Sequence, residues 1–110
     1  EDIIAWQKSQ DLAVEIYKKF RTNKDFSFRD QICRASVSVS NNIAEGFGRK
    51  GDKQFKHFLY VGLGSAMEVN SMLYLAKRLD YINKEEEITF RNKGNEVCRL
   101  LRGLINSLKD

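Results

Sequence analysis

The apolar residues of this chain fall into four stretches with the spacing of one face of an α-helix. These stretches cover roughly residues 4–21, 29–47, 53–79 and 84–108. Because residues at i, i+3, i+4 and i+7 share a helix face, the pattern predicts four amphipathic helices. Helices joined by short connections must alternate in direction, so we expect an all-α, antiparallel up-down-up-down four-helix bundle.

Spacing also predicts which side chains face the core. In the first and last helices these are Trp6, Ala13, Ile16, Tyr17, Phe20, Ile88, Cys98, Leu101, Ile105 and Leu108. Residues 36–43 contain β-branched valines among serines and could be interpreted as a strand, but the alternation fails at Asn41-Asn42. We interpret this segment as helix, with a face of small residues that lets the third helix approach closely.

The third helix carries more apolar residues than one core readily buries. A seven-residue repeat follows one of its faces, which is typical of left-handed helix packing. Four residues lie off that face and indicate a second interface, with another copy of the chain: Tyr60, Leu63, Met67 and Tyr74.

Capping residues mark the expected helix ends. Gly46 or Gly48 is expected to close the second helix in the left-handed conformation, which glycine adopts without steric cost. Asp52 is expected to cap the third helix and Asn83 the fourth, where Glu85–Glu87 complement the helix dipole.

Length and composition fit one domain over residues 1–110, with no proline to interrupt a helix. No apolar run approaches the roughly 20 residues that span a bilayer, and the first residues lack the pattern of a signal peptide. We therefore expect a cytoplasmic protein without a membrane partner. Cys33 and Cys98 are far apart in sequence and are expected to be buried thiols.

No catalytic constellation is recognisable. The single histidine, His57, lacks the Glu-x-x-His spacing of di-iron bundles, and the glycine-rich segment 47–51 follows a helix rather than the strand that precedes a phosphate loop. Glu45 and Glu68 could approach each other across the bundle, but no metal-ligand set accompanies them. We expect no enzyme activity, no cofactor and no metal.

Residues 31–49 carry a dense pattern that resembles a known family. The matching positions are Gln31, Arg34, Ala35, Ser38, Val39, Asn42, Ile43, Ala44, Glu45, Gly46 and Arg49. The pattern resembles the bacterial four-helix-bundle family encoded in intervening sequences of large-subunit ribosomal RNA genes. The chain departs from it at Leu63, where relatives often carry arginine.

The resemblance implies a ring-like homo-oligomer, a pentamer, without established enzymatic activity. It also implies similarity to the accessory proteins of diversity-generating retroelements, which work with a reverse transcriptase and RNA. RNA or a nucleic-acid enzyme is therefore an expected partner.

Polar residues of the second helix require partners if they are buried. Asn42 and Glu45 are three residues apart and can interact. We expect a structural polar network of Arg34, Asn42 and Glu45 with Ser65 and Glu68 of the third helix, which would fix helix register. The alternative is a direct role for these residues in binding a ligand or nucleic acid.

The chain is basic, with a net charge of +4 and a pI near 9.1. Its candidate nucleic-acid-binding residues form one cluster after the second helix and another on the fourth: Arg49, Lys50, Lys53 and Lys56, then Arg99 and Arg102. A ring multiplies such patches, which favours phosphate binding. We therefore predict a non-enzymatic, homo-oligomeric scaffold that binds RNA. The alternative is a structural or protein-protein interaction module with no nucleic-acid role.

Overall fold

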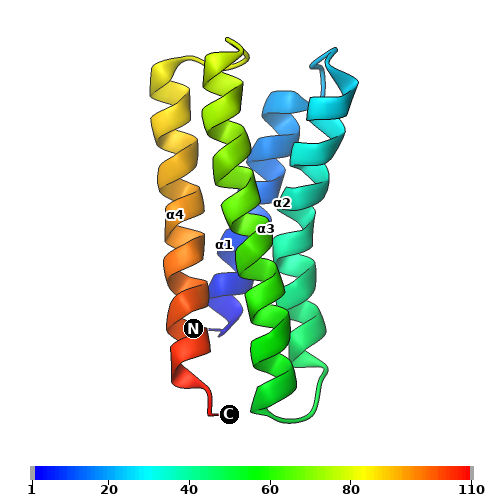
Figure 1. Cartoon of the computed structure of the whole chain (residues 1–110), viewed down its shortest axis with the longest axis vertical. Helices are drawn as coiled ribbons and strands as arrows, with labels where there is room; N and C mark the ends of the chain where they lie inside the picture. Colours follow the sequence, from blue (N-terminus) through cyan, green and yellow to red (C-terminus); the bar gives the residue numbers. More distant parts are fainter. Residues whose placement is uncertain (1, 110) are drawn as a thin grey trace.

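The computed structural model describes residues 2–109, so Glu1 and Asp110, the ends of the expected domain, lie outside it. Four helices run along its 43 Å length: α1 (Asp2–Phe20), α2 (Phe26–Phe47), α3 (Asp52–Arg78) and α4 (Lys84–Ser107) (Figure 1). The predicted all-α bundle is confirmed. The largest difference in helix boundaries is at the start of α2, which begins three residues earlier than predicted.

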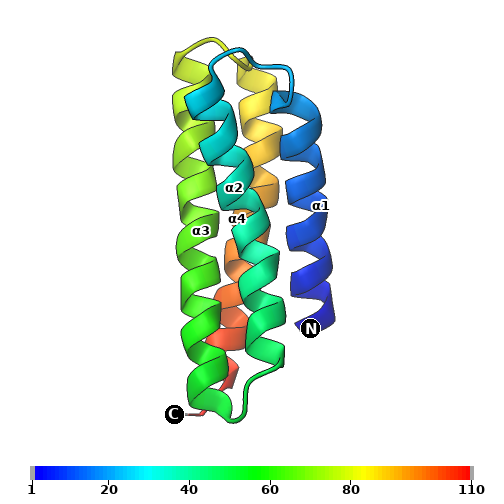
Figure 2. The ribbon, with the colours of Figure 1, turned by 90° about the vertical axis from the view of Figure 1, so that its right-hand side faces the viewer.

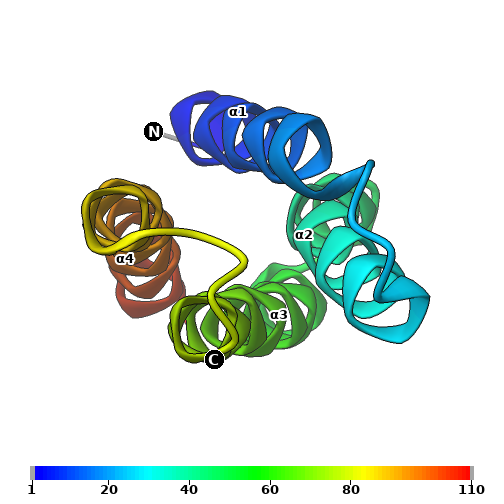
Figure 3. The same ribbon diagram turned by 90° about the horizontal axis from the view of Figure 1, so that it is seen from above.

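Consecutive helices run in opposite directions and lie beside one another around the bundle (Figures 2 and 3). The α1–α2 and α3–α4 connections therefore share one end of the molecule. The α2–α3 connection lies at the other end together with the end of α4, whereas α1 begins short of that end (Figure 1). This arrangement decides which charged clusters meet.

The buried apolar residues of all four helices form one cluster in the middle of the bundle. Leu63, expected at an outer interface, belongs to this core and is only 9% exposed. It follows Leu59 by four residues and precedes Ala66 by three, so all three share one helix face. Tyr17 and Ile88 were expected inside but are exposed. At the start of α4 it is Glu87, next to Ile88, that occupies the inward position.

Small residues let α2 and α3 pack closely, as predicted. A Cβ atom on Gly62 of α3 would lie 3.4 Å from the carbonyl oxygen of Val39 in α2. The two backbones are therefore in contact where Gly62 provides no side chain, and a residue larger than alanine would push them apart.

The helix caps differ in part from the predictions. Gly48 closes α2 with a right-handed φ of −81°, and it is Gly51, with φ 84°, that takes the positive angle. Gly51 precedes Asp52, so Asp52 is the first residue of α3 and not its cap. The predicted cap at Asn83 is confirmed: its side chain accepts from the Glu86 N–H at 2.8 Å, and Glu86 accepts from the Asn83 N–H at 2.9 Å.

Asp25 ties together the two connections at one end of the bundle. Its carboxylate caps α2 by accepting from the Phe28 N–H at 3.2 Å, and it accepts from the Tyr81 hydroxyl at 2.6 Å. These two hydrogen bonds, the one from Tyr81 more than the one from Phe28, lower the pKa of Asp25. The hydrogen bond to Asp25 also raises the pKa of Tyr81.

Candidate nucleic-acid interface

The two basic clusters lie at the same end of the bundle. Because α4 runs antiparallel to α3, its last turns lie beside the first turns of α3. The Lys109 backbone N–H donates to the Asp52 carboxylate at 3.1 Å, which places the end of α4 against the start of α3. Arg99 lies eight residues before the end of α4, about 12 Å along the axis. We refer to Arg49, Lys50, Lys53, Lys56, Arg99 and Arg102 as the basic end.

Most cations of the basic end are available to a ligand. Arg49, Lys50, Lys53, Arg99 and Arg102 are exposed, and Lys56 is half-buried. Within residues 2–109, only Arg49 of those five exposed cations has an ion pair, with Glu45 one turn earlier in α2. In this part of the chain, the other four have no acidic partner that a ligand must displace.

Aromatic side chains lie next to these cations. The guanidinium of Arg49 lies 5.0 Å from the ring centroid of Phe58, and the Phe47 and Phe55 rings are 5.5 Å apart. A Cβ on Gly46 would lie 2.6 Å from the ring of Phe55, so glycine there makes room for this contact. Phe47 is exposed and offers an apolar surface beside the positive charge.

Part of the expected polar network bridges α2 and α3 through Ser38. The Asn42 side-chain amide donates to the Ser38 carbonyl at 2.8 Å and to its hydroxyl oxygen at 3.0 Å. The Ser65 hydroxyl donates to the same Ser38 oxygen at 2.9 Å. Ser38 was matched to the family pattern but was not assigned to the network, although it lies one turn before Asn42.

The three charged members of that network lie on the surface. Arg34, Glu45 and Glu68 are exposed, which spares them the cost of losing hydration. Glu68 accepts a hydrogen bond from the Gln31 side chain of α2 at 3.1 Å. Gln31 precedes Glu45 by fourteen residues, which is about 21 Å along the helix axis. The expected buried network is therefore wrong for these charged residues, and Glu45 and Glu68 do not form a carboxylate pair.

An exposed stripe runs along α3. Tyr60, Met67 and Tyr74 recur every seven residues and are 51–56% exposed. The guanidinium of Arg91 in α4 lies 6.0 Å from the Tyr74 ring centroid. We refer to these three residues as the α3 stripe; Leu63, the fourth interface candidate, lies in the core.

Both cysteines are buried free thiols, and burial raises the pKa of each. Over residues 2–109, His, Cys, Asp and Glu side chains form no group of three or more that could hold a metal ion. No helix in this part of the chain combines the length and apolar character needed to cross a membrane.

Comparison with known proteins gives a consistent family. A family described as 23S rRNA-intervening sequence protein matches residues 1–103. A crystal structure from Bacteroides thetaiotaomicron, of a protein with unknown function from the S23 ribosomal protein family, superposes with a TM-score of 0.90. The two chains are 31% identical over 96% of this chain and 97% of the other. No curated protein matches the sequence.

Proposed function

Since the chain belongs to the 23S rRNA-intervening sequence protein family, we propose that it is a non-enzymatic, cytoplasmic, homo-oligomeric scaffold that binds RNA through its basic end. The observation that carries this proposal is the meeting of two basic clusters at one end of the bundle. Four of their side chains are exposed and have no ion pair within residues 2–109: Lys50, Lys53, Arg99 and Arg102.

Phosphate contacts favour binding of any RNA sequence. Lysine and arginine release counterions from the nucleic acid when they contact phosphates, and this release dominates sequence-independent affinity. Base-specific reading would need side chains presented to exposed base edges. Phe47 supplies an apolar surface on which an unpaired base can rest, so we expect limited sequence preference.

The α3 stripe supports assembly into a ring, which we take to be the pentamer implied by the family resemblance. Three large apolar or aromatic side chains, each more than 50% exposed, lie along one face of a long helix. Burial of such a face against another copy removes apolar surface from water. A ring would also bring several basic ends together, and the net charge of +4 per chain would add up.

A salt titration of RNA binding tests the basic end. The double variant Lys50→Glu, Lys53→Glu should weaken binding and reduce the slope of log affinity against log salt, by about 0.7 for each single-stranded phosphate that the protein no longer neutralises. The matched control is Lys24→Glu, Arg78→Glu, which makes the same charge change at the opposite end. The proposal would be overturned if RNA affinity changed neither with salt concentration nor with the Lys50 and Lys53 substitutions.

Light scattering tests the assembly separately. The unmodified chain should elute with the mass of an oligomer, and Met67→Glu should reduce that mass by placing a charge in the α3 stripe. An oligomer that retains no RNA at low salt would support the alternative, a structural or protein-protein interaction module with no nucleic-acid role.

A further inference from the structure

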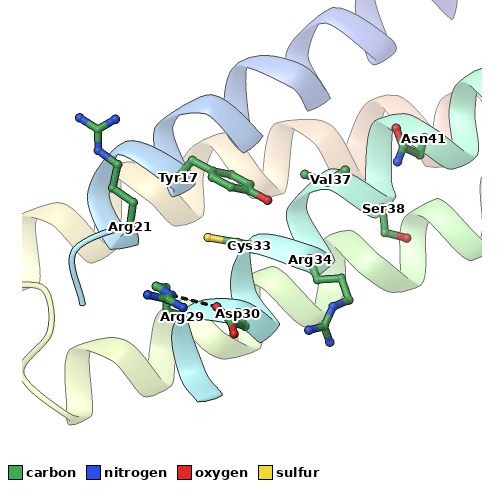
Figure 4. Close-up of a pocket in the computed structure, with 9 residues that line it drawn as sticks. All are labelled: Tyr17, Arg21, Arg29, Asp30, Cys33, Arg34, Val37, Ser38 and Asn41. Carbon is green, nitrogen blue, oxygen red and sulfur yellow. Dashed lines mark hydrogen bonds and ion pairs between the residues drawn. The ribbon is translucent and has the colours of Figure 1, made fainter. Parts of the chain in front are cut away.

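A groove of about 630 Å³ lies between α1 and α2, towards the end of the bundle that carries the α1–α2 connection (Figure 4). A second hollow of about 350 Å³ shares Tyr17, Arg21, Val37 and Asn41 with it and extends it along α1. The combined groove is distinct from the basic end. Of its residues only Arg34 was considered for nucleic-acid binding, as the alternative to a role in the polar network.

The groove has a positive lining. Arg21, Arg29 and Arg34 contribute to its walls, and the Asp30 carboxylate accepts from the Arg29 side chain at 2.8 Å. Within residues 2–109, the guanidinium groups of Arg21 and Arg34 have neither a hydrogen bond nor an ion pair. The acidic side chain in the lining is thus already neutralised, and two fixed positive charges remain available to an anionic ligand.

An aromatic ring lies between these two charges. Tyr17 is 44% exposed and extends across the groove towards Val37, while Arg21 and Arg34 point to opposite sides of it (Figure 4). Arg21 follows Tyr17 by one helical turn, and Arg34 precedes Val37 by three residues. The groove therefore combines a flat apolar surface with a cation on either side.

We propose that this groove binds a segment of single-stranded RNA, with one base on Tyr17 and Val37 and the neighbouring phosphates at Arg21 and Arg34. Stacking of bases on aromatic side chains along a positive groove is how many proteins hold unpaired strands. A double helix keeps its bases stacked on each other, so it cannot use the Tyr17 surface. The Asn41 side chain adds a hydrogen-bonding group to the same wall. The inference shares its ligand class with the proposed function, on which it rests, but uses a different site.

Amide chemical-shift mapping with the full chain tests the groove. A single-stranded trinucleotide should shift the resonances of Tyr17, Arg34, Val37 and Asn41, and a duplex RNA of moderate length should not. Tyr17→Leu should weaken trinucleotide binding, and the matched variant Tyr17→Phe should retain it because the ring remains. Arg34→Gln should weaken it by about tenfold, the loss of one charge-assisted contact. Arg34 has no partner within residues 2–109, so this variant should fold normally.

Two outcomes overturn the inference: a trinucleotide that leaves the groove resonances unmoved, or equal affinities of Tyr17→Leu and Tyr17→Phe. Failure of the proposed function looks different. If Lys50→Glu, Lys53→Glu leaves RNA affinity unchanged while the trinucleotide still shifts the groove resonances, the basic end is not an RNA site and the inference about the groove is supported. If charge reversal at the basic end weakens RNA binding and the trinucleotide does not shift the groove resonances, the proposed function is supported and the groove is not an RNA site.

Discussion

The contact between α3 and α4 at Gly94 allows a quantitative test of the packing. A Cβ atom on Gly94 would lie 2.1 Å from the Asn70 Oδ1 atom and 3.0 Å from its Cγ atom. An alanine at position 94 must therefore displace the Asn70 side chain. That side chain donates from Nδ2 to the Asn95 Oδ1 atom at 3.0 Å, a bond that links the two helices.

Two opposing terms decide the effect of Gly94→Ala. Replacing glycine by alanine inside a helix stabilises the folded state by about 1 kcal/mol. Breaking the Asn70–Asn95 hydrogen bond costs about 0.5–1.5 kcal/mol, and forcing a packed side chain aside adds to that cost. Gly94→Ala should therefore be neutral or slightly destabilising.

Gly103 is the matched control, since it lies in the same helix and a Cβ atom added there would have no neighbouring atom within 4 Å. Gly103→Ala should stabilise the fold by about 0.5–1 kcal/mol. The difference between the two variants should approach about 1 kcal/mol, or roughly 4–8 °C in Tm for a chain of this size.

Urea denaturation followed by circular dichroism measures both variants. The variant Asn70→Ala, Gly94→Ala removes the obstructing side chain, so relative to Asn70→Ala alone it should regain the stabilisation seen at Gly103. If Gly94→Ala stabilises the chain as much as Gly103→Ala while the Asn70–Asn95 hydrogen bond persists, the α3–α4 packing described above is incorrect.

Three further features of the fold can each be tested by one substitution or one measurement. The folded-state pKa of Asp25 is lowered, so its stabilisation is present above the unfolded-state pKa and is lost as pH falls through the folded value; Tyr81→Phe should raise that pKa in a carboxyl NMR titration and flatten the acid dependence of stability. Asn83→Ala should cost about 1 kcal/mol in urea denaturation, because it removes a helix cap; an unchanged midpoint would contradict the capping box. Cys33 and Cys98 should react with a thiol reagent more slowly in the folded chain than in urea, since burial blocks access and raises both pKa values; equal rates would contradict their burial.

Local patterns predicted the helices well because a helix face is a property of nearby residues. The apolar spacing located all four helices, and Asn83 was identified as a cap because it precedes three glutamates that complement the helix dipole. The same reasoning failed where the answer depended on a neighbouring helix. Leu63 was placed outside because its own repeat excluded it, yet α3 packs against both α2 and α4 and buries a wider face.

The candidate site was predictable only in part. Charge clusters were visible in sequence, but their meeting at one end follows from the antiparallel topology and the Lys109–Asp52 hydrogen bond. The expected burial of Arg34 was wrong: its side chain is exposed in the wall of the groove between α1 and α2. The α1–α2 groove itself had no sequence signal, since Tyr17 and Arg34 are 17 positions apart and meet only after α1 and α2 pair.

The location of the chain ends has a practical consequence for experiments. The end of α4 lies at the end of the bundle that carries the α2–α3 connection (Figure 1), where the Lys109 N–H donates to the Asp52 carboxylate. A polyhistidine tag or a fused reporter attached after α4 would therefore emerge next to the start of α3, near Lys53, where it would contact RNA or shield the basic end from it. Such a tag should be removed before RNA affinity is measured.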